Sequence, residues 1–164
     1  KRLITNKNYK SQSQGSGMGY ESMVDERGVM LPNPDVGQGN ADELVWMFGK
    51  DLNAFELNLT WGHYSKNGKW HRASEMHTHP TEEILIFVGM DPDNPDYLGA
   101  ELELGMGIEC ERHIFNVPTV AICPQSFPHL PLITRWVDKP YGFVVFCLDG
   151  EHDSPWVNID PADI

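Results

Sequence analysis

Two histidines separated by one residue are the first sign of chemistry in this sequence. His77 and His79 would point to the same side of a β-strand, because side chains at positions i and i+2 share a face. The carboxylates of Glu82 and Glu83 follow shortly afterwards. An imidazole pair with a nearby carboxylate suits divalent iron, manganese, nickel or zinc. We therefore expect these residues to contribute to a metal site.

A third histidine, much further along the chain, is a candidate fourth ligand. His129 ends the segment PQSFPH at residues 124–129 and precedes the apolar Leu130. The prolines of this segment indicate a tight turn. An imidazole in apolar surroundings needs a partner, because burying an unpaired polar group is unfavourable. A metal ion would supply that partner.

Short β-strands are the elements that must position these side chains. Apolar and polar residues alternate over residues 55–63, which is typical of a half-buried strand. The Asn67-Gly68 pair predicts a hairpin turn after it. Many short strands between glycine and proline turns favour a sandwich or barrel, and no strong helical pattern occurs. Further strands are expected at residues 76–79, 84–88, 100–104, 108–115, 119–122, 132–136 and 142–148.

The chain of 164 residues suits one domain with a substantial core. Residues 1–41 are rich in Ser, Gln, Gly, Asn and Pro, a composition that buries little apolar surface. We expect them to form an extended or partly disordered N-terminal arm. Residues 42–150 would form the folded barrel, and residues 151–164 a C-terminal tail.

The two histidine segments, in this order on an all-β pattern, resemble the two motifs of the cupin superfamily. The first motif is H-x-H, then a glutamate after three or four residues, then a glycine roughly six residues on. Residues 77–89 read HTHPTEEILIFVG. The second motif is P-x-G-x-x-H, and residues 124–129 read PQSFPH. The resemblance covers roughly residues 42–150 and implies an all-β jelly-roll barrel, also called a double-stranded β-helix.

By this resemblance the metal ligands would be His77, His79, Glu83 and His129. Five residues separate Glu83 from Gly89, one fewer than the motif has. We prefer Glu83 to Glu82 because the spacing from the histidine pair sets the coordination geometry.

The second motif also departs from its usual form, because Ser126 stands where the motif has a glycine. Either the turn does not need a positive φ angle, or Ser126 carries a small backbone strain. Neither this departure nor the shortened spacing in the first motif removes a ligand.

Four protein ligands would leave open coordination positions for water, dioxygen or a chelating substrate, as in a catalytic metal site. We expect a metal-dependent enzyme that acts on a small chelating organic molecule. Iron is the favoured metal and dioxygenase or oxidase chemistry the favoured reaction. A redox-neutral isomerase or lyase, and a non-catalytic cupin that binds a small molecule or metal, are the alternatives.

His63 is the candidate acid–base catalyst. It shares a strand face with Leu59 and Trp61, and if that face points inward, its imidazole could approach the metal. The alternative is a histidine at a strand end near the predicted hairpin.

The composition narrows the possible partners and compartments. Twelve basic residues against 24 acidic ones give a net charge of −12, which disfavours nucleic acid and anionic membranes. Three cysteines without a C-x-x-C pair fit the cytoplasm and buried free thiols. Residues 84–88 are apolar on both strand faces, which predicts a homodimer unless the N-terminal arm covers them.

Overall fold

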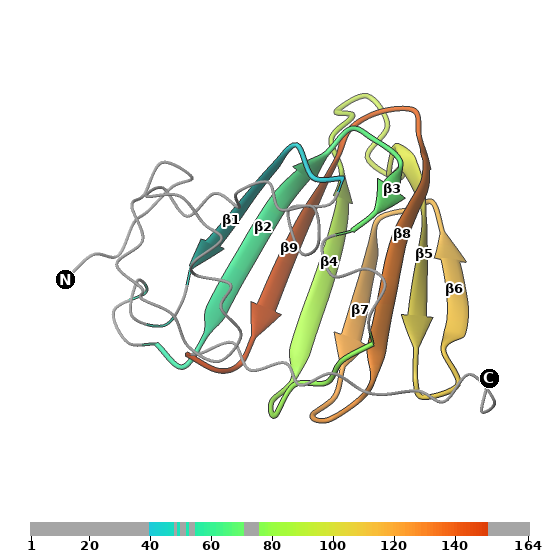
Figure 1. The fold of residues 1–164 in the computed structure, drawn as a ribbon. Helices are drawn as coiled ribbons and strands as arrows, with labels where there is room; N and C mark the ends of the chain where they lie inside the picture. Colours follow the sequence, from blue (N-terminus) through green and yellow to red (C-terminus); the bar gives the residue numbers. More distant parts are fainter. Residues whose placement is uncertain (1–39, 48, 50–51, 53–54, 71–75, 151–164) are drawn as a thin grey trace.

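Figure 1 shows the chain as a computed structural model, which describes residues 40–47, 49, 52, 55–70 and 76–150. Of the predicted N-terminal arm, only Asn40 and Ala41 belong to the described residues, and the predicted tail at residues 151–164 lies wholly outside them. The arm and the tail therefore stay predictions.

The described residues form nine β-strands and no helix. The part of the chain that the structure describes therefore has no helix long and apolar enough to cross a membrane. The strands are β1 (Glu43–Met47), β2 (Asn58–Tyr64), β3 (Gly68–Lys69), β4 (Glu83–Gly89), β5 (Ala100–Met106), β6 (Glu111–Phe115), β7 (Thr119–Cys123), β8 (His129–Val137) and β9 (Tyr141–Cys147).

The strands form two sheets, and all pairings between them are antiparallel. One sheet has the order β1-β2-β9-β4-β7 and the other the order β3-β8-β5-β6. Neighbours such as β9 and β4 are far apart in the sequence, so the sheets are held by non-local pairing. This two-sheet arrangement confirms the predicted all-β jelly-roll class.

Side chains from both sheets build the core. In β4 the residues Leu85 and Phe87 are buried, while their neighbours Ile84 and Ile86 are half-buried. Leu102 of β5 belongs to the same buried cluster. The alternation along β4 is the period-two pattern of a strand with one face turned to the core.

Aromatic rings fill one end of this core. Tyr64 stacks on Tyr141 with ring centroids 5.1 Å apart. The ring of Phe143 lies 4.5 Å from Trp70 and 5.2 Å from Phe87, centroid to centroid. Such packed aromatic pairs add to the stabilisation from buried apolar area.

The strand register places polar side chains at the opposite end. Asn58 of β2 faces Cys147 of β9, which in turn faces Glu83 of β4. Tyr64 and Tyr141 pair at the far ends of the same strands. One end of the interior is therefore aromatic, and the other carries a carboxylate.

The face of β2 that enters the core carries the polar residues of the alternating pattern. Asn58, Thr60 and Tyr64 are buried, whereas Trp61 and His63 on the other face are half-buried. The outward apolar face is also partly covered, since Trp61 lies beside the buried Val45 of β1. Alternation does not reveal which face is inside when both are covered.

Two local predictions were wrong. The Asn67-Gly68 turn does not join a hairpin, because β3 pairs with β8 in the other sheet rather than with β2. Residues 76–79 do not form a strand, and only His77 makes an isolated bridge, to His129. In both places the pairing partner is remote in sequence, which a local pattern does not identify.

The homodimer stays a prediction. The outer face of β4 and β7 carries exposed apolar residues that could form its interface. Ile122 and Val120 of β7 are 62% and 58% exposed and lie beside Ile84 and Ile86. We expect the protein to be dimeric by light scattering and Ile122→Lys to make it monomeric. Val117→Lys, at an exposed apolar residue outside this strand face, is the control. A monomeric native protein would contradict the prediction.

Candidate metal centre

Reciprocal backbone hydrogen bonds join the two histidine segments. The His77 N–H donates to the carbonyl of His129 at 3.2 Å, and the His129 N–H donates to the carbonyl of His77 at 3.1 Å. The Ser126 N–H also donates to the carbonyl of His79 at 2.8 Å. The segment before β4 is thereby held against the turn before β8. This pairing explains how residues so distant in sequence come to share one site.

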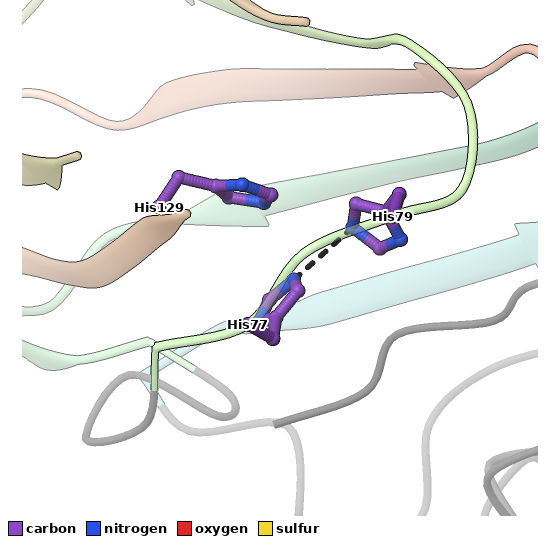
Figure 2. Close-up of side chains that lie close together, drawn as sticks. All are labelled: His77, His79 and His129. Carbon is purple, nitrogen blue, oxygen red and sulfur yellow. Dashed lines mark hydrogen bonds between the residues drawn. The ribbon is translucent and has the colours of Figure 1, made fainter. Parts of the chain in front are cut away.

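Four predicted ligand side chains converge there. His77 Nε2 lies 3.1 Å from His79 Nε2, and Figure 2 shows these rings beside that of His129. The Glu83 carboxylate completes the group, with Oε1 3.4 Å from His79 Nε2 and Oε2 2.9 Å from His129 Nε2. All four residues are at least 95% buried. We call His77, His79, Glu83 and His129 the histidine–glutamate cluster.

The spacing of these donor atoms fits a metal ion. Metal bonds to imidazole nitrogen and carboxylate oxygen are about 2.0–2.2 Å long. Two such ligands at right angles stand about 3.0 Å apart, and at the tetrahedral angle about 3.4 Å apart. The three separations above, from 2.9 to 3.4 Å, fall in this range. The ligating atoms of the three histidines also lie within 4.8 Å of one another.

Glu83, rather than Glu82, lies beside the histidines. Glu83 begins β4 on its inward face and is buried, whereas the preceding Glu82 is exposed. Successive residues entering a strand point to opposite faces, so only one of the two can reach the histidines. The preference for Glu83 in the sequence therefore agrees with the geometry.

The glycine of the first motif and the serine that replaces the glycine of the second motif each have a structural explanation. A Cβ atom at Gly89 would overlap the carbonyl oxygen of Tyr97, so this position requires a residue without a side chain. Ser126 adopts a φ of 60°, in the left-handed region that favours glycine. Of the two alternatives left open for Ser126, the strained backbone is the one observed.

Two thiols flank the carboxylate. Glu83 faces Cys123 of β7 on one side and Cys147 of β9 on the other. The Cys147 thiol donates to Glu83 Oε1 at 3.2 Å. Burial, together with the charge of Glu83, raises the pKa of Cys147 well above its usual value. Both cysteines are buried thiols that form no disulfide within the described chain, as predicted. Their place in the site was not predicted, because only strand register brings them there.

His129 is held by a partner outside the cluster. Its Nδ1 lies 3.0 Å from the carbonyl oxygen of Phe127. A carbonyl oxygen only accepts, so Nδ1 carries the hydrogen and donates. Such a bond fixes the ring orientation and leaves Nε2 directed at the cluster.

Charge in the cluster favours a protonated His129 when no metal is bound. Burial alone would lower the pKa of His129, but hydrogen bonds with Cys123 and Glu83 and the charge of Glu83 outweigh it. Together they raise the pKa of His129 to about 10. The imidazolium and the carboxylate then form an ion pair, which a metal ion would replace.

His63 does not join the cluster. It lies on the face of β2 opposite the buried Tyr64 and faces Gly142 of β9. It lies five positions along β2 from Asn58 at the cluster end, or about 16 Å at the usual rise of a strand. The catalytic role of His63 stays a prediction.

Comparison with known proteins finds similarity in solved structures alone. No protein-family model matches the chain, and no curated protein matches it. An oxalate oxidase in complex with the substrate analogue glycolate is 12% identical with a TM-score of 0.50. That alignment covers 76% of this chain and 57% of the oxidase chain.

Two further structures are similar over the same share of this chain. Oxalate decarboxylase from Bacillus subtilis is 11% identical with a TM-score of 0.50, and the alignment covers 76% of this chain and 30% of that one. The polyketide cyclase RemF from Streptomyces resistomycificus is 16% identical with a TM-score of 0.48, with 76% and 78% covered. This chain thus spans less than two thirds of the oxidase and decarboxylase chains. At these identities the likeness shows the fold alone.

Removal of the Glu83 carboxylate should weaken metal binding far more than removal of its exposed neighbour. We expect Glu83→Gln to lower the affinity for Mn²⁺ by more than the ~10–100-fold that loss of an outer hydrogen-bond partner causes. Glu82→Gln should leave it unchanged. Isothermal titration of the metal-free variants measures both, and the reverse order would assign the ligand to Glu82.

The metal-free protein should lose stability as pH rises above neutrality. The pKa of His129 is about 10 in the folded chain, against about 6.5 in the unfolded one. The stabilisation from the bound proton is therefore complete below about pH 6.5 and falls as pH rises towards 10. Urea unfolding with chelator present, from pH 6.5 to 8.5, should show a decline that His129→Gln lacks. A flat profile in the native protein would contradict this assignment.

Proposed function

Because the chain has the cupin fold, we propose that it is a metal-dependent enzyme that acts on a small organic molecule at the histidine–glutamate cluster. The observation that carries this proposal is the convergence of three buried imidazoles and one buried carboxylate at ligand spacing. A divalent ion would stabilise this cluster, because buried charges need partners. His77, His79, Glu83 and His129 would hold the ion.

A bound divalent ion would supply Lewis acidity and, if redox-active, chemistry with dioxygen. The chain's own residues hold the ligand side chains in place and supply the negative charge that would face the ion. The Phe127 carbonyl orients His129, and the Cys147 thiol binds the carboxylate of Glu83. An anionic substrate could bind the ion through its open coordination positions.

The buried polar and charged residues favour a substrate that chelates the metal. The buried polar and charged residues of the described chain include no lysine or arginine. They are Asn40, Asn58, Thr60, His77, His79, Glu83, His129 and Thr134. A substrate carboxylate at the cluster would therefore depend on the metal for its counter-charge. Small molecules with two adjacent oxygen donors, such as dicarboxylates, 2-oxo acids and 2-hydroxy acids, meet this requirement.

Dioxygenase or oxidase chemistry with iron is the leading reaction class, because a site of three histidines and one carboxylate with open positions suits iron and dioxygen. Manganese, nickel or zinc would fit the same donors. One similar structure is an oxidase and another a decarboxylase, so a redox-neutral lyase or isomerase is the second candidate. A cupin that binds a small molecule without turnover is the third.

Elemental analysis of the protein purified without a metal-binding tag should find about one divalent ion per chain. Oxygen uptake with a panel of dicarboxylates, 2-oxo acids and 2-hydroxy acids then tests the leading class. Substrate loss under nitrogen would indicate the redox-neutral class, and saturable binding without loss would indicate a binding protein.

His77→Ala is the control for this experiment and should lose both the metal and the activity while the barrel still folds. His113→Ala, at an exposed histidine of β6, should keep both. A native protein that contains no metal and takes none up on titration would overturn the proposal.

A further inference from the structure

We propose that Cys147 is a further metal ligand, so that the centre takes thiophilic divalent ions through a thiolate as well as through imidazole and carboxylate. This inference rests on the proposed function only in requiring that the histidine–glutamate cluster binds a metal. It concerns which ion the site prefers and by which atoms it is held.

The strand register aims Cys147 at the cluster. Cys147 ends β9 and faces both Asn58 of β2 and Glu83 of β4. All three residues are at least 96% buried, and side chains level with one another on neighbouring strands point to the same face. The thiol therefore enters the interior from the same side of the barrel as the carboxylate that is proposed to bind the ion.

The distances place the sulfur beside the donor atoms of Glu83 and His79. Cys147 Sγ lies 3.2 Å from Glu83 Oε1, and the same oxygen lies 3.4 Å from His79 Nε2. The ligating atoms of His79, Glu83 and Cys147 all lie within 4.8 Å of one another. Metal bonds of about 2.1 Å to oxygen and 2.3 Å to sulfur, at right angles, separate the two ligand atoms by about 3.1 Å. The observed oxygen–sulfur separation matches this value.

The surroundings of Cys147 differ from those of a core cysteine that only fills space. A free cysteine in a core usually behaves as a small hydrophobe, whereas this thiol interacts with the side chains of Glu83 and Asn58. On metal binding the thiol would release its proton to solvent, and a sulfur lone pair would form the new bond. Oxidation states do not change. Thiolate ligands favour zinc, cobalt and cadmium over manganese or magnesium.

Cys123 provides the matched comparison, because it flanks Glu83 on the other side. Its hydrogen bond is with His129, and we assign it to positioning that imidazole rather than to the metal. Its sulfur belongs to a second compact group, with Glu83 and His129, so the choice between the two cysteines is open to experiment. Cys110, which is only half-buried and lies outside these groups, serves as a control for nonspecific thiol binding.

Cobalt titration of the metal-free full chain, with a phosphine reductant in place of thiols, tests the proposal. We expect one Co²⁺ per chain with a thiolate-to-cobalt charge-transfer band in the near ultraviolet. Cys147→Ser should bind one Co²⁺ without the band, while Cys123→Ser and Cys110→Ser should keep it. Cys147→Ser should also lower the affinity for Cd²⁺ at least about tenfold more than it lowers the affinity for Mn²⁺.

The outcomes separate this proposal from the function on which it rests. One Co²⁺ bound by the native protein without the band overturns the thiolate ligand and leaves the metal centre intact. A band that persists in Cys147→Ser and disappears in Cys123→Ser also overturns it. No Co²⁺ bound at all overturns both proposals. The first and last of these outcomes are measured on the native protein alone. They therefore hold even if a variant does not fold.

Discussion

The two backbone hydrogen bonds between His77 and His129 are the constraint on which the site depends. They join the segment before β4 to the start of β8, across the two sheets. A bridge of one residue pair is weak by itself, since a hydrogen bond contributes about 1 kcal/mol net. Here it is reinforced by the Ser126–His79 hydrogen bond and by the strands that continue from both segments. The imidazoles are consequently held at fixed spacing before any ligand arrives.

The barrel interior is divided along its strands. Rings of Tyr64, Tyr141 and Phe143 close one end, where Thr134 also hydrogen-bonds Tyr141 at 2.7 Å. The polar groups gather at the other end, around Glu83. Dense aromatic packing at one end supplies stabilisation through buried apolar area. That stability offsets the unfavourable burial of several ionisable groups at the other end.

Within the histidine–glutamate cluster the donor atoms must interact with each other when no ion is present. Two imidazole nitrogens 3.1 Å apart share at most one hydrogen, and a proton on His129 pairs with Glu83. A central cation would instead attract all four donor groups at once. The same geometry therefore forms a metal-free network and would also suit a preformed ligand set. The Cys147 thiol adds a softer donor beside it.

The sequence by itself indicated the kind of fold and predicted the four residues that the structure brings together in the histidine–glutamate cluster. Alternating residues and turn signals indicated strands, and the H-x-H pair and His129 named three of the four predicted ligands. These inferences were possible because strand periodicity and donor chemistry are local properties of the chain. The predicted boundaries of β4, β7 and β9 are consequently close to those observed.

Only the tertiary structure decided which face of each strand is inside and which strands are neighbours. Period two shows that Leu59, Trp61 and His63 share a face, but not that Thr60 points into the core. The place of Cys123 and Cys147 beside Glu83 follows from pairing between β4, β7 and β9. Such pairing depends on the packing of the whole barrel, because segments distant in sequence become neighbours only when their apolar faces are buried together.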